Sequence, residues 1–294
     1  MSVSVNENVK RRIPWFVKIP AKIALSRIPV GALLWQNLNL FRAGAMDNPS
    51  YAYNTFKKHY SAARRTDLRG CTVLELGPGN SLLTALFARS LAADHTILVD
   101  SERLATQDLS IFSQAERMLS DLGLPIFGVS TSPSLDETLN RLNATYLTGG
   151  LNSLRSIGDG EVDFLFSNAV LEHIRLAEFA PLLKETRRVL KPGGAASHVI
   201  DFRDHLQNGL NHLRFSEKVW ESEFMARSGF YTNRLSWPVM QNIFEEAGFA
   251  VEACSLERWQ AGLPTPQRSM ALPFRGRAPE ELMTMLAHVV LWPK

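Results

Sequence analysis

The segment at residues 73–80, Val-Leu-Glu-Leu-Gly-Pro-Gly-Asn, constrains the fold more than any other part of the chain. The apolar run before the glycines is interrupted only by Glu75, and it predicts a short buried strand. Gly77 and Gly79 permit backbone angles and a close ligand approach that a Cβ would hinder. Apolar residues at helical spacing follow over 82–87. A strand, a glycine turn and a helix N-terminus together predict a nucleotide-sized binding site.

Beyond residue 70 the apolar pattern alternates between strands and helices. The expected strands are 72–77, 95–100, 144–148, 162–168, 195–202, 249–256 and 285–293. Helices are expected between them, among them 103–122, 134–142 and 237–246. This alternation predicts a doubly wound α/β fold with a mostly parallel sheet. The last two expected strands are joined by a long connection, and such a pair favours an antiparallel edge strand that closes the sheet.

An acidic residue ends the second expected strand. The interior of that strand, Thr-Ile-Leu-Val, is apolar, so Asp100 lies at its carboxyl end, where open parallel sheets bind ligands. A carboxylate there can accept hydrogen bonds from both hydroxyls of a ribose. The same side chain can also cap the following helix, and the two roles are compatible.

A second informative segment joins the fourth and fifth expected strands. The fourth strand ends at Ser167 and Asn168, and a turn containing Glu172 and His173 follows. The sequence Leu-Lys-Pro-Gly-Gly at 190–194 then predicts a turn before the fifth strand. That strand carries His198 and Asp201, so several proton-transfer groups lie near the carboxyl ends of two neighbouring strands.

The organisation of the 294 residues suggests a main domain with additions. Residues 1–70 are predicted to form a basic, aromatic, helical arm, with the helix at 49–65 serving as a lid. Residues 71–294 are predicted to form the α/β domain. Within that domain the strand pattern stops at 203–235, which predicts a helical cap insertion.

Composition and charge exclude several function classes. Hydrophobic residues make up 45% of the chain, and its net charge of +3 is too small to indicate nucleic-acid binding. Cys71 and Cys254 match no metal or redox spacing, so a reduced, cytoplasmic setting is expected. No apolar run approaches the roughly 18 residues that span a bilayer. Residues 10–28 combine basic and apolar side chains, which predicts either peripheral contact with the inner face of a membrane or packing on the protein itself.

Together these segments resemble class I S-adenosylmethionine-dependent methyltransferases. The resemblance rests on Glu75-Leu-Gly-Pro-Gly-Asn80, on Asp100, on Ser167-Asn-Ala-Val-Leu-Glu-His173 and on the turn at 190–194, in the family's order over roughly 70–200. It implies a Rossmann-like, seven-stranded sheet with an antiparallel last strand and S-adenosyl-L-methionine as the cofactor. It looks closest to bacterial enzymes of glycan and small-molecule pathways.

The resemblance also implies roles for individual residues. Glu75 and the glycine turn would hold the methionine end of the cofactor, Asp100 its ribose and Asn168 its methionine portion, while the loop at 149–151 would lie near adenine. The cofactor-binding residues implied are Glu75, Gly77, Pro78, Gly79, Asn80, Asp100, Ser101, Gly150, Leu151 and Asn168.

Other chemistries fit less well. A nicotinamide-binding turn needs a third glycine where the chain has Leu82. Methyltransferases that act on nucleic-acid bases have a motif similar to Asx-Pro-Pro-aromatic after the fourth strand, whereas this chain has Ser-Asn-Ala-Val there. A metal-binding Glu-x-x-Glu-His is broken by Ala169, although Glu172, His173 and His198 could still form a metal site.

The expected reaction is O-methylation of a small hydroxylated or sugar-containing acceptor. A hydroxyl is a poor nucleophile and benefits from a general base, for which His198, His173 and Asp201 are the candidates. For His173 a purely structural hydrogen bond is the alternative. Methylation of a nitrogen or a carboxylate remains a second possibility, and a module that binds cofactor or membrane without catalysis is a third.

Overall fold

The structure is a computed structural model that describes residues 45–294. The segment at 10–28 and most of the predicted arm lie outside the described residues. Within 45–294 one seven-stranded sheet has the order β3-β2-β1-β4-β5-β7-β6. The strands are β1 (Thr72–Leu76), β2 (His95–Val99), β3 (Ala144–Leu147), β4 (Val162–Asn168), β5 (Leu190–Asp201), β6 (Phe249–Arg258) and β7 (Thr284–Pro293).

The expected sheet is confirmed. β1 to β5 pair in parallel, and β7 runs antiparallel to both of its neighbours. β7 lies between β5 and β6, so of the last two strands it is β6 that forms the antiparallel edge. The pattern of burial explains the order: five of the ten residues of β7 are consecutive and buried, whereas most of β6 is partly or fully exposed.

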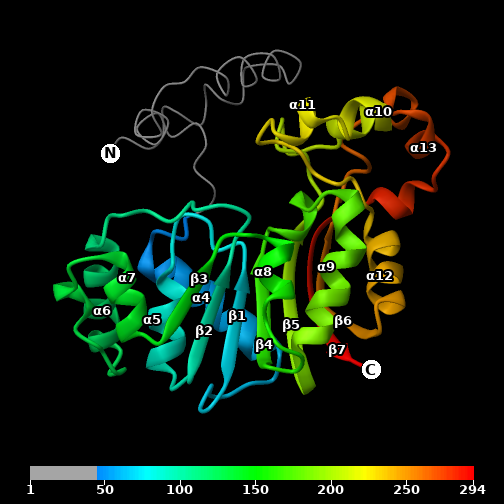
Figure 1. Cartoon of the computed structure of the whole chain (residues 1–294). Coiled ribbons are helices and arrows are strands. Elements are labelled where there is room, and N and C mark those ends of the chain that lie inside the picture. The colour runs from blue at the N-terminus through cyan, green and yellow to red at the C-terminus, as the bar shows by residue number, and fades with distance from the viewer. Residues whose placement is uncertain (1–44) are drawn as a thin grey trace.

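Helices cover both faces of the sheet (Figure 1). One hydrophobic cluster gathers side chains of α4 (Pro49–Ala62), α5 (Leu83–Ser90), α6 (Ser110–Asp121) and α7 (Leu135–Arg141). A second cluster, on the opposite face, involves α8 (Leu151–Arg155), α9 (Leu176–Val189) and α12 (Trp237–Glu246). Because both faces are covered, the central strands are mostly apolar, as is typical of parallel sheets.

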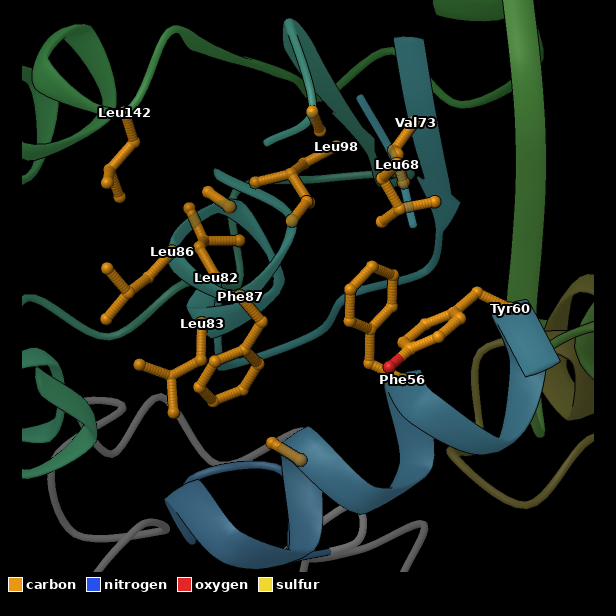
Figure 2. Packing of buried hydrophobic residues seen from close by; sticks show 14 of the residues in the cluster. Phe56, Tyr60, Leu68, Val73, Leu82, Leu83, Leu86, Phe87, Leu98 and Leu142 are labelled. Atoms are coloured by element: carbon orange, nitrogen blue, oxygen red, sulfur yellow. The ribbon is translucent and has the colours of Figure 1, made fainter. Parts of the chain in front are cut away.

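Helix α4 is part of the core. The Asn48 side chain accepts a hydrogen bond from the Tyr51 N–H at 3.0 Å and caps the helix. Phe56 and Tyr60 point toward α5 and the sheet (Figure 2), and the Phe56 ring lies 5.4 Å from that of Phe166 in β4. The apolar side of this helix is therefore buried against the sheet, and its role as a lid stays a prediction.

Two element boundaries differ from the prediction by five residues or more. β5 begins at Leu190 instead of 195, because Leu190 already pairs with Val162 before the register shifts. Helix α6 begins at Ser110 instead of 103. The residues before it turn back toward β1 and β3: the Thr106 N–H donates to the Asn80 carbonyl, and the Leu104 N–H donates to the Tyr146 hydroxyl.

A helical cap adjoins the carboxyl ends of the strands and is built from two segments. The first is the expected insertion and contains η3 (Asn211–Arg214), α10 (Glu217–Trp220) and α11 (Glu223–Ala226). The second connects β6 to β7 and contains η4 (Gln267–Ser269), α13 (Leu272–Arg275) and η5 (Pro279–Leu282). Figure 1 shows both segments together, in yellow and orange-red, and the Ala271 N–H donates to the Leu213 carbonyl between them.

The remaining short elements are η1 (Val129–Thr131) and η2 (Leu171–His173). Among residues 45–294 no helix combines the length and apolar character needed to cross a membrane.

Candidate active site

The glycine turn after β1 has the geometry that its sequence predicts. Gly77 and Gly79 both adopt positive φ angles, +68° and +67°. The Gly77 N–H donates to the Val99 carbonyl at 2.8 Å, which joins the turn to the end of β2. A Cβ placed on Gly79 would meet no atom within 4 Å, so open space adjoins the turn at this residue.

Asp100 connects the ends of three strands. One carboxylate oxygen accepts from the Gly79 N–H at 2.9 Å, and the other accepts from the Ser101 N–H at 2.8 Å. Its own carbonyl accepts from the Gly150 N–H at 2.8 Å. Burial raises the pKa of Asp100 above the ordinary aspartate value. The carboxylate thus lies between the glycine turn and the loop at 149–151, and its oxygens keep lone pairs for further donors.

Glu75 is a buried carboxyl group with an unused oxygen. Only 2% of the residue is exposed, and its Oε2 has no hydrogen-bond partner among residues 45–294. Burial raises the pKa of Glu75 to about 8. A buried acceptor without a partner is costly, so it indicates a donor that arrives with a ligand.

These features fit S-adenosyl-L-methionine. Its ammonium group matches the unused Glu75 oxygen, its ribose hydroxyls match Asp100, and the open space beside Gly79 admits a ligand close to the backbone. The other predicted cofactor residues lie around the same strand ends: Gly77, Pro78 and Asn80 in the turn, Ser101 after β2, Gly150 and Leu151 at the start of α8, and Asn168 at the end of β4.

The turn after β4 carries His173 and is fixed by the cap. The Asn233 side-chain amide donates to the Leu171 carbonyl at 2.8 Å and to the Ile174 carbonyl at 3.1 Å. The Asn233 N–H donates to the Glu172 carbonyl at 2.7 Å. Asn233 is buried, so these bonds are shielded from water and hold η2 against the cap.

His173 forms a pair with His205. The two Nε2 atoms lie 3.1 Å apart, and the rings stack with their centroids 4.9 Å apart. His173 Nδ1 lies 2.8 Å from the Tyr231 carbonyl, which can only accept, so Nδ1 carries the hydrogen. The Nε2 of neutral His173 therefore holds a lone pair toward His205, which donates to it. Burial of the ring lowers the pKa of His173, which favours this neutral form near pH 7.

Asp201 and Glu172 lie next to this pair and support it. The Asp201 carboxylate pairs with the Arg203 guanidinium at 2.7 Å. The Asp201 N–H donates to Glu172 Oε1 at 3.3 Å, and burial raises the pKa of Glu172 to about 8. With its carboxylate engaged by Arg203, Asp201 is a weaker candidate for the base than His173.

The prediction that His198 is a general base is not supported by its position. The residue is fully buried, its Nδ1 lies 2.8 Å from Ser167 Oγ, and its ring stacks on Phe244 of α12. Burial lowers its pKa to about 3. A base must come within hydrogen-bond reach of the acceptor, and a fully buried His198 that packs on α12 is poorly placed for this.

The possible metal site made of Glu172, His173 and His198 is not assembled. His173 contacts His205, while His198 contacts Ser167 inside the sheet. Among residues 45–294 no group of three or more His, Cys, Asp or Glu side chains is placed to hold a metal ion.

Three residues of the site were not predicted. His205 follows the fifth strand closely, and its proximity to the strand end is a local signal that could have been used. Tyr231 contacts His173, which lies 58 residues earlier in the sequence. Asn233 contacts Leu171 and Ile174, which lie 62 and 59 residues earlier. No local pattern predicts such contacts.

Comparison with known proteins agrees with this geometry. Residues 112–197 match the family model described as "Methyltransferase domain", a range that starts in α6 and ends in β5. No curated protein matches the sequence.

Several solved structures are similar. The YcgJ protein of Bacillus subtilis is 14% identical, with 83% of this chain and 99% of that chain covered and a TM-score of 0.45. An S-adenosylmethionine-dependent methyltransferase of Mesorhizobium loti is 16% identical, with 79% and 96% covered and a TM-score of 0.43. An O-methyltransferase family protein of Burkholderia thailandensis is 11% identical, with 82% and 56% covered and a TM-score of 0.43.

The identification rests on the family match together with the observed sheet and the positions of the motifs around it. The matched range contains the turn after β4 and the start of β5, while the glycine turn and Asp100 lie before it and adjoin the same strand ends. Residues 112–197 thus match a methyltransferase-domain family model, and the sheet and the motifs around that range fit a class I S-adenosylmethionine-dependent methyltransferase with S-adenosyl-L-methionine as its cofactor.

Proposed function

We propose that this methyltransferase transfers the methyl group to a hydroxyl oxygen of a small or sugar-containing acceptor. The observation that carries the proposal is the His173–His205 pair, with the two Nε2 atoms 3.1 Å apart beside the carboxyl ends of β4 and β5. A hydroxyl needs a proton acceptor, unlike an amine or a carboxylate, and a neutral imidazole supplies one near pH 7.

The proton transfer can be assigned to one atom. The Tyr231 carbonyl fixes the hydrogen of His173 on Nδ1, so Nε2 is the basic nitrogen. An acceptor hydroxyl that takes the place of His205 at this lone pair can give its proton to Nε2. The cofactor, when bound, supplies a methyl group already activated on a sulfonium sulfur. The protein then has to align the acceptor hydroxyl with the methyl carbon and remove the hydroxyl proton.

Methyl-labelled cofactor incubated with fractionated cell extract tests the reaction class. A labelled methyl ether in the product is the expected result, and a labelled amine or ester would contradict O-methylation. His173→Gln should reduce turnover by about 10²-fold or more, since general-base catalysis contributes that much. His95→Gln is the matched control, because His95 begins β2 and bonds to Thr145, away from the carboxyl ends of the strands.

The cofactor assignment has a separate test. Asp100→Ala removes both carboxylate oxygens that would meet the ribose, so calorimetry should show severely weakened binding of S-adenosylmethionine. Asp121→Ala, at the end of α6, is a control on the protein surface. Normal affinity in Asp100→Ala would remove Asp100 from the cofactor site.

Peripheral membrane contact through residues 10–28 stays a prediction, since this segment lies outside the described residues. Its support is the combination of lysine and arginine with apolar side chains in one short segment. Flotation with anionic liposomes, for the full chain and for a variant without residues 1–30, would test it. Equal flotation of the two proteins would exclude a role for this segment.

A further inference from the structure

A cavity lies between the two cap segments and the ends of β5 and β7. It holds about 260 Å³ of empty space, part of it open to solvent. Phe202, just after β5, and Leu210, in the first cap segment, both line it. His205 lies between these two residues in the sequence, so the loop that carries it is bordered by the cavity at both ends.

Arg234 brings a buried positive charge to this cavity. Only 8% of the residue is exposed, and the backbone has a positive φ of +59°, which is uncommon for a side chain of this size. Its Nη1 donates to the Phe215 carbonyl at 2.7 Å, while its Nε has no hydrogen-bond partner among residues 45–294. The carboxylates of Asp201 and Glu223 form ion pairs with other arginines, and within the described part of the chain no ion pair includes Arg234.

Two aromatic rings hold the guanidinium in place. Its central carbon lies 5.6 Å from the centroid of Trp220 and 5.2 Å from that of Phe274, one from each cap segment. Aromatic contacts of this kind orient an arginine but leave its N–H groups without acceptors. Glu221 and Glu217 act on the guanidinium electrostatically without forming an ion pair with it, but its buried Nε has no acceptor within 45–294, so the arrangement indicates an acceptor atom that arrives with a ligand.

Other polar groups around the cavity fit the same ligand. His212 is buried, its Nδ1 has no partner within 45–294, and burial lowers its pKa to about 3, so the neutral ring can donate one hydrogen bond. A second guanidinium, that of Arg277, stacks on Phe274 and donates to the Ser236 hydroxyl, which lines the cavity.

We infer that the cap cavity binds a carboxylate group of the methyl acceptor through Arg234, with His212 as a second donor. Glu281 also lines the cavity, and its negative charge favours a monoanion over a doubly charged phosphate. The planar fork of arginine matches a carboxylate. That this carboxylate belongs to the methyl acceptor rests on the proposed function. The acceptor would then extend from the histidine pair to Arg234.

Glycolate, a small hydroxy acid, and its neutral amide, glycolamide, are suitable probes. Ligand-observed NMR with the full chain, without cofactor and at constant ionic strength, measures their binding independently of methyl transfer. The wild type should bind glycolate about tenfold or more tightly than glycolamide, since hydrogen bonds to charged groups are worth that difference. Equal binding of the two probes, or phosphate binding more tightly than glycolate, would overturn the inference.

Variants then locate the binding to one side chain. Arg234→Gln should reduce glycolate affinity about tenfold, and Arg234→Lys, which keeps the charge without the fork, should give an intermediate value. Arg275→Gln is the control, because the Arg275 side chain donates to the Met270 carbonyl and does not line the cavity. Circular dichroism checks that each variant is folded. Unchanged glycolate affinity in both Arg234 variants would exclude the site, whether or not the protein proves to methylate a hydroxyl.

Discussion

A Cβ on Gly77 would lie 2.6 Å from Cγ2 of Val170. The turn after β4 therefore packs directly on the glycine turn after β1. Val170 is followed at once by η2, which carries His173. The glycine turn is proposed to hold the cofactor, and the turn with His173 is proposed to hold the acceptor. These two parts of the site thus contact each other at Gly77.

Gly77→Ala should therefore affect both sides of the site. The positive φ alone costs about 1–2 kcal/mol for a residue with a Cβ, and the contact with Val170 adds to that cost. Thermal unfolding should show a larger loss of stability than for Gly79→Ala, which has the same sign of φ but open space around its Cβ. Equal losses in the two variants would mean that Val170 moves aside easily.

The stability of the cofactor-free protein should decrease as the pH rises from about 6.5 to about 8. Glu75 has an ordinary pKa of 4.5 and a folded-state pKa of about 8, so the folded protein keeps a proton that the unfolded chain releases, and its contribution to the free energy of unfolding falls between these values. Glu172, with a folded pKa of about 8, contributes in the same direction. Burial lowers the pKa of His198 and His212 to about 3, and this acts in the opposite direction only below their ordinary pKa of 6.5.

Chemical denaturation at several pH values between 6.5 and 8 would measure this dependence. Glu75→Gln keeps the shape of the protonated side chain, so its unfolding free energy should vary less with pH than that of the wild type. A variant with the same slope as the wild type would show that Glu75 does not hold the proton.

His198→Ala should reduce stability and leave the chemistry intact. The change opens a cavity beside Phe244 and leaves Ser167 without its partner, which costs about 2–4 kcal/mol. Turnover measured at a temperature where the variant is folded should be close to that of the wild type. Lost turnover with unchanged stability would restore His198 as a catalytic residue.

Asn233→Ala should impair turnover more than cofactor binding. The change removes the two donors that hold the Leu171 and Ile174 carbonyls, so the turn with His173 becomes free to move. Two unpaired buried carbonyls also cost about 1–3 kcal/mol each. Steady-state kinetics and cofactor calorimetry would separate the two effects. Asn140→Ala, on the exposed side of α7, is the control, and equal kinetics in both variants would contradict the positioning role.

The sequence predicted the strands well because each is a short apolar run with a clear end. Helix α12 was expected at the residues it occupies, 237–246, because Ser236 and Pro238 mark its start. Helix α6 was predicted seven residues too early, because the polar residues at 102–108 resemble a first helical turn. Their backbone bonds to Asn80 and Tyr146 come from distant parts of the chain, and no local pattern contains them.

The face on which a strand residue lies was harder to predict. Ser197 and His198 are neighbours in β5, and both are fully buried. Ser197 Oγ lies 2.8 Å from His59 Nδ1 and 3.0 Å from His288 Nε2, while His198 faces the opposite layer. Successive side chains of a strand point to opposite faces of the sheet. Because helices cover both faces here, this alternation does not show which side chains could reach a ligand and which are enclosed. This is why the sequence favoured His198, which the structure places inside the fold.

The position of β7 between β5 and β6 has a consequence for synthesis on the ribosome. β2 to β5 each pair with a strand already made, but β6 pairs only with β7, which is translated later. Nascent domains begin to fold before translation ends, so β6 emerges beside a partly formed sheet with both of its edges unpaired. Glu252, Glu257 and Arg258 place charges along this strand, and charges on an unpaired strand discourage pairing with other chains. The acidic and basic side chains of β6 thus protect the growing polypeptide until its partner strand arrives.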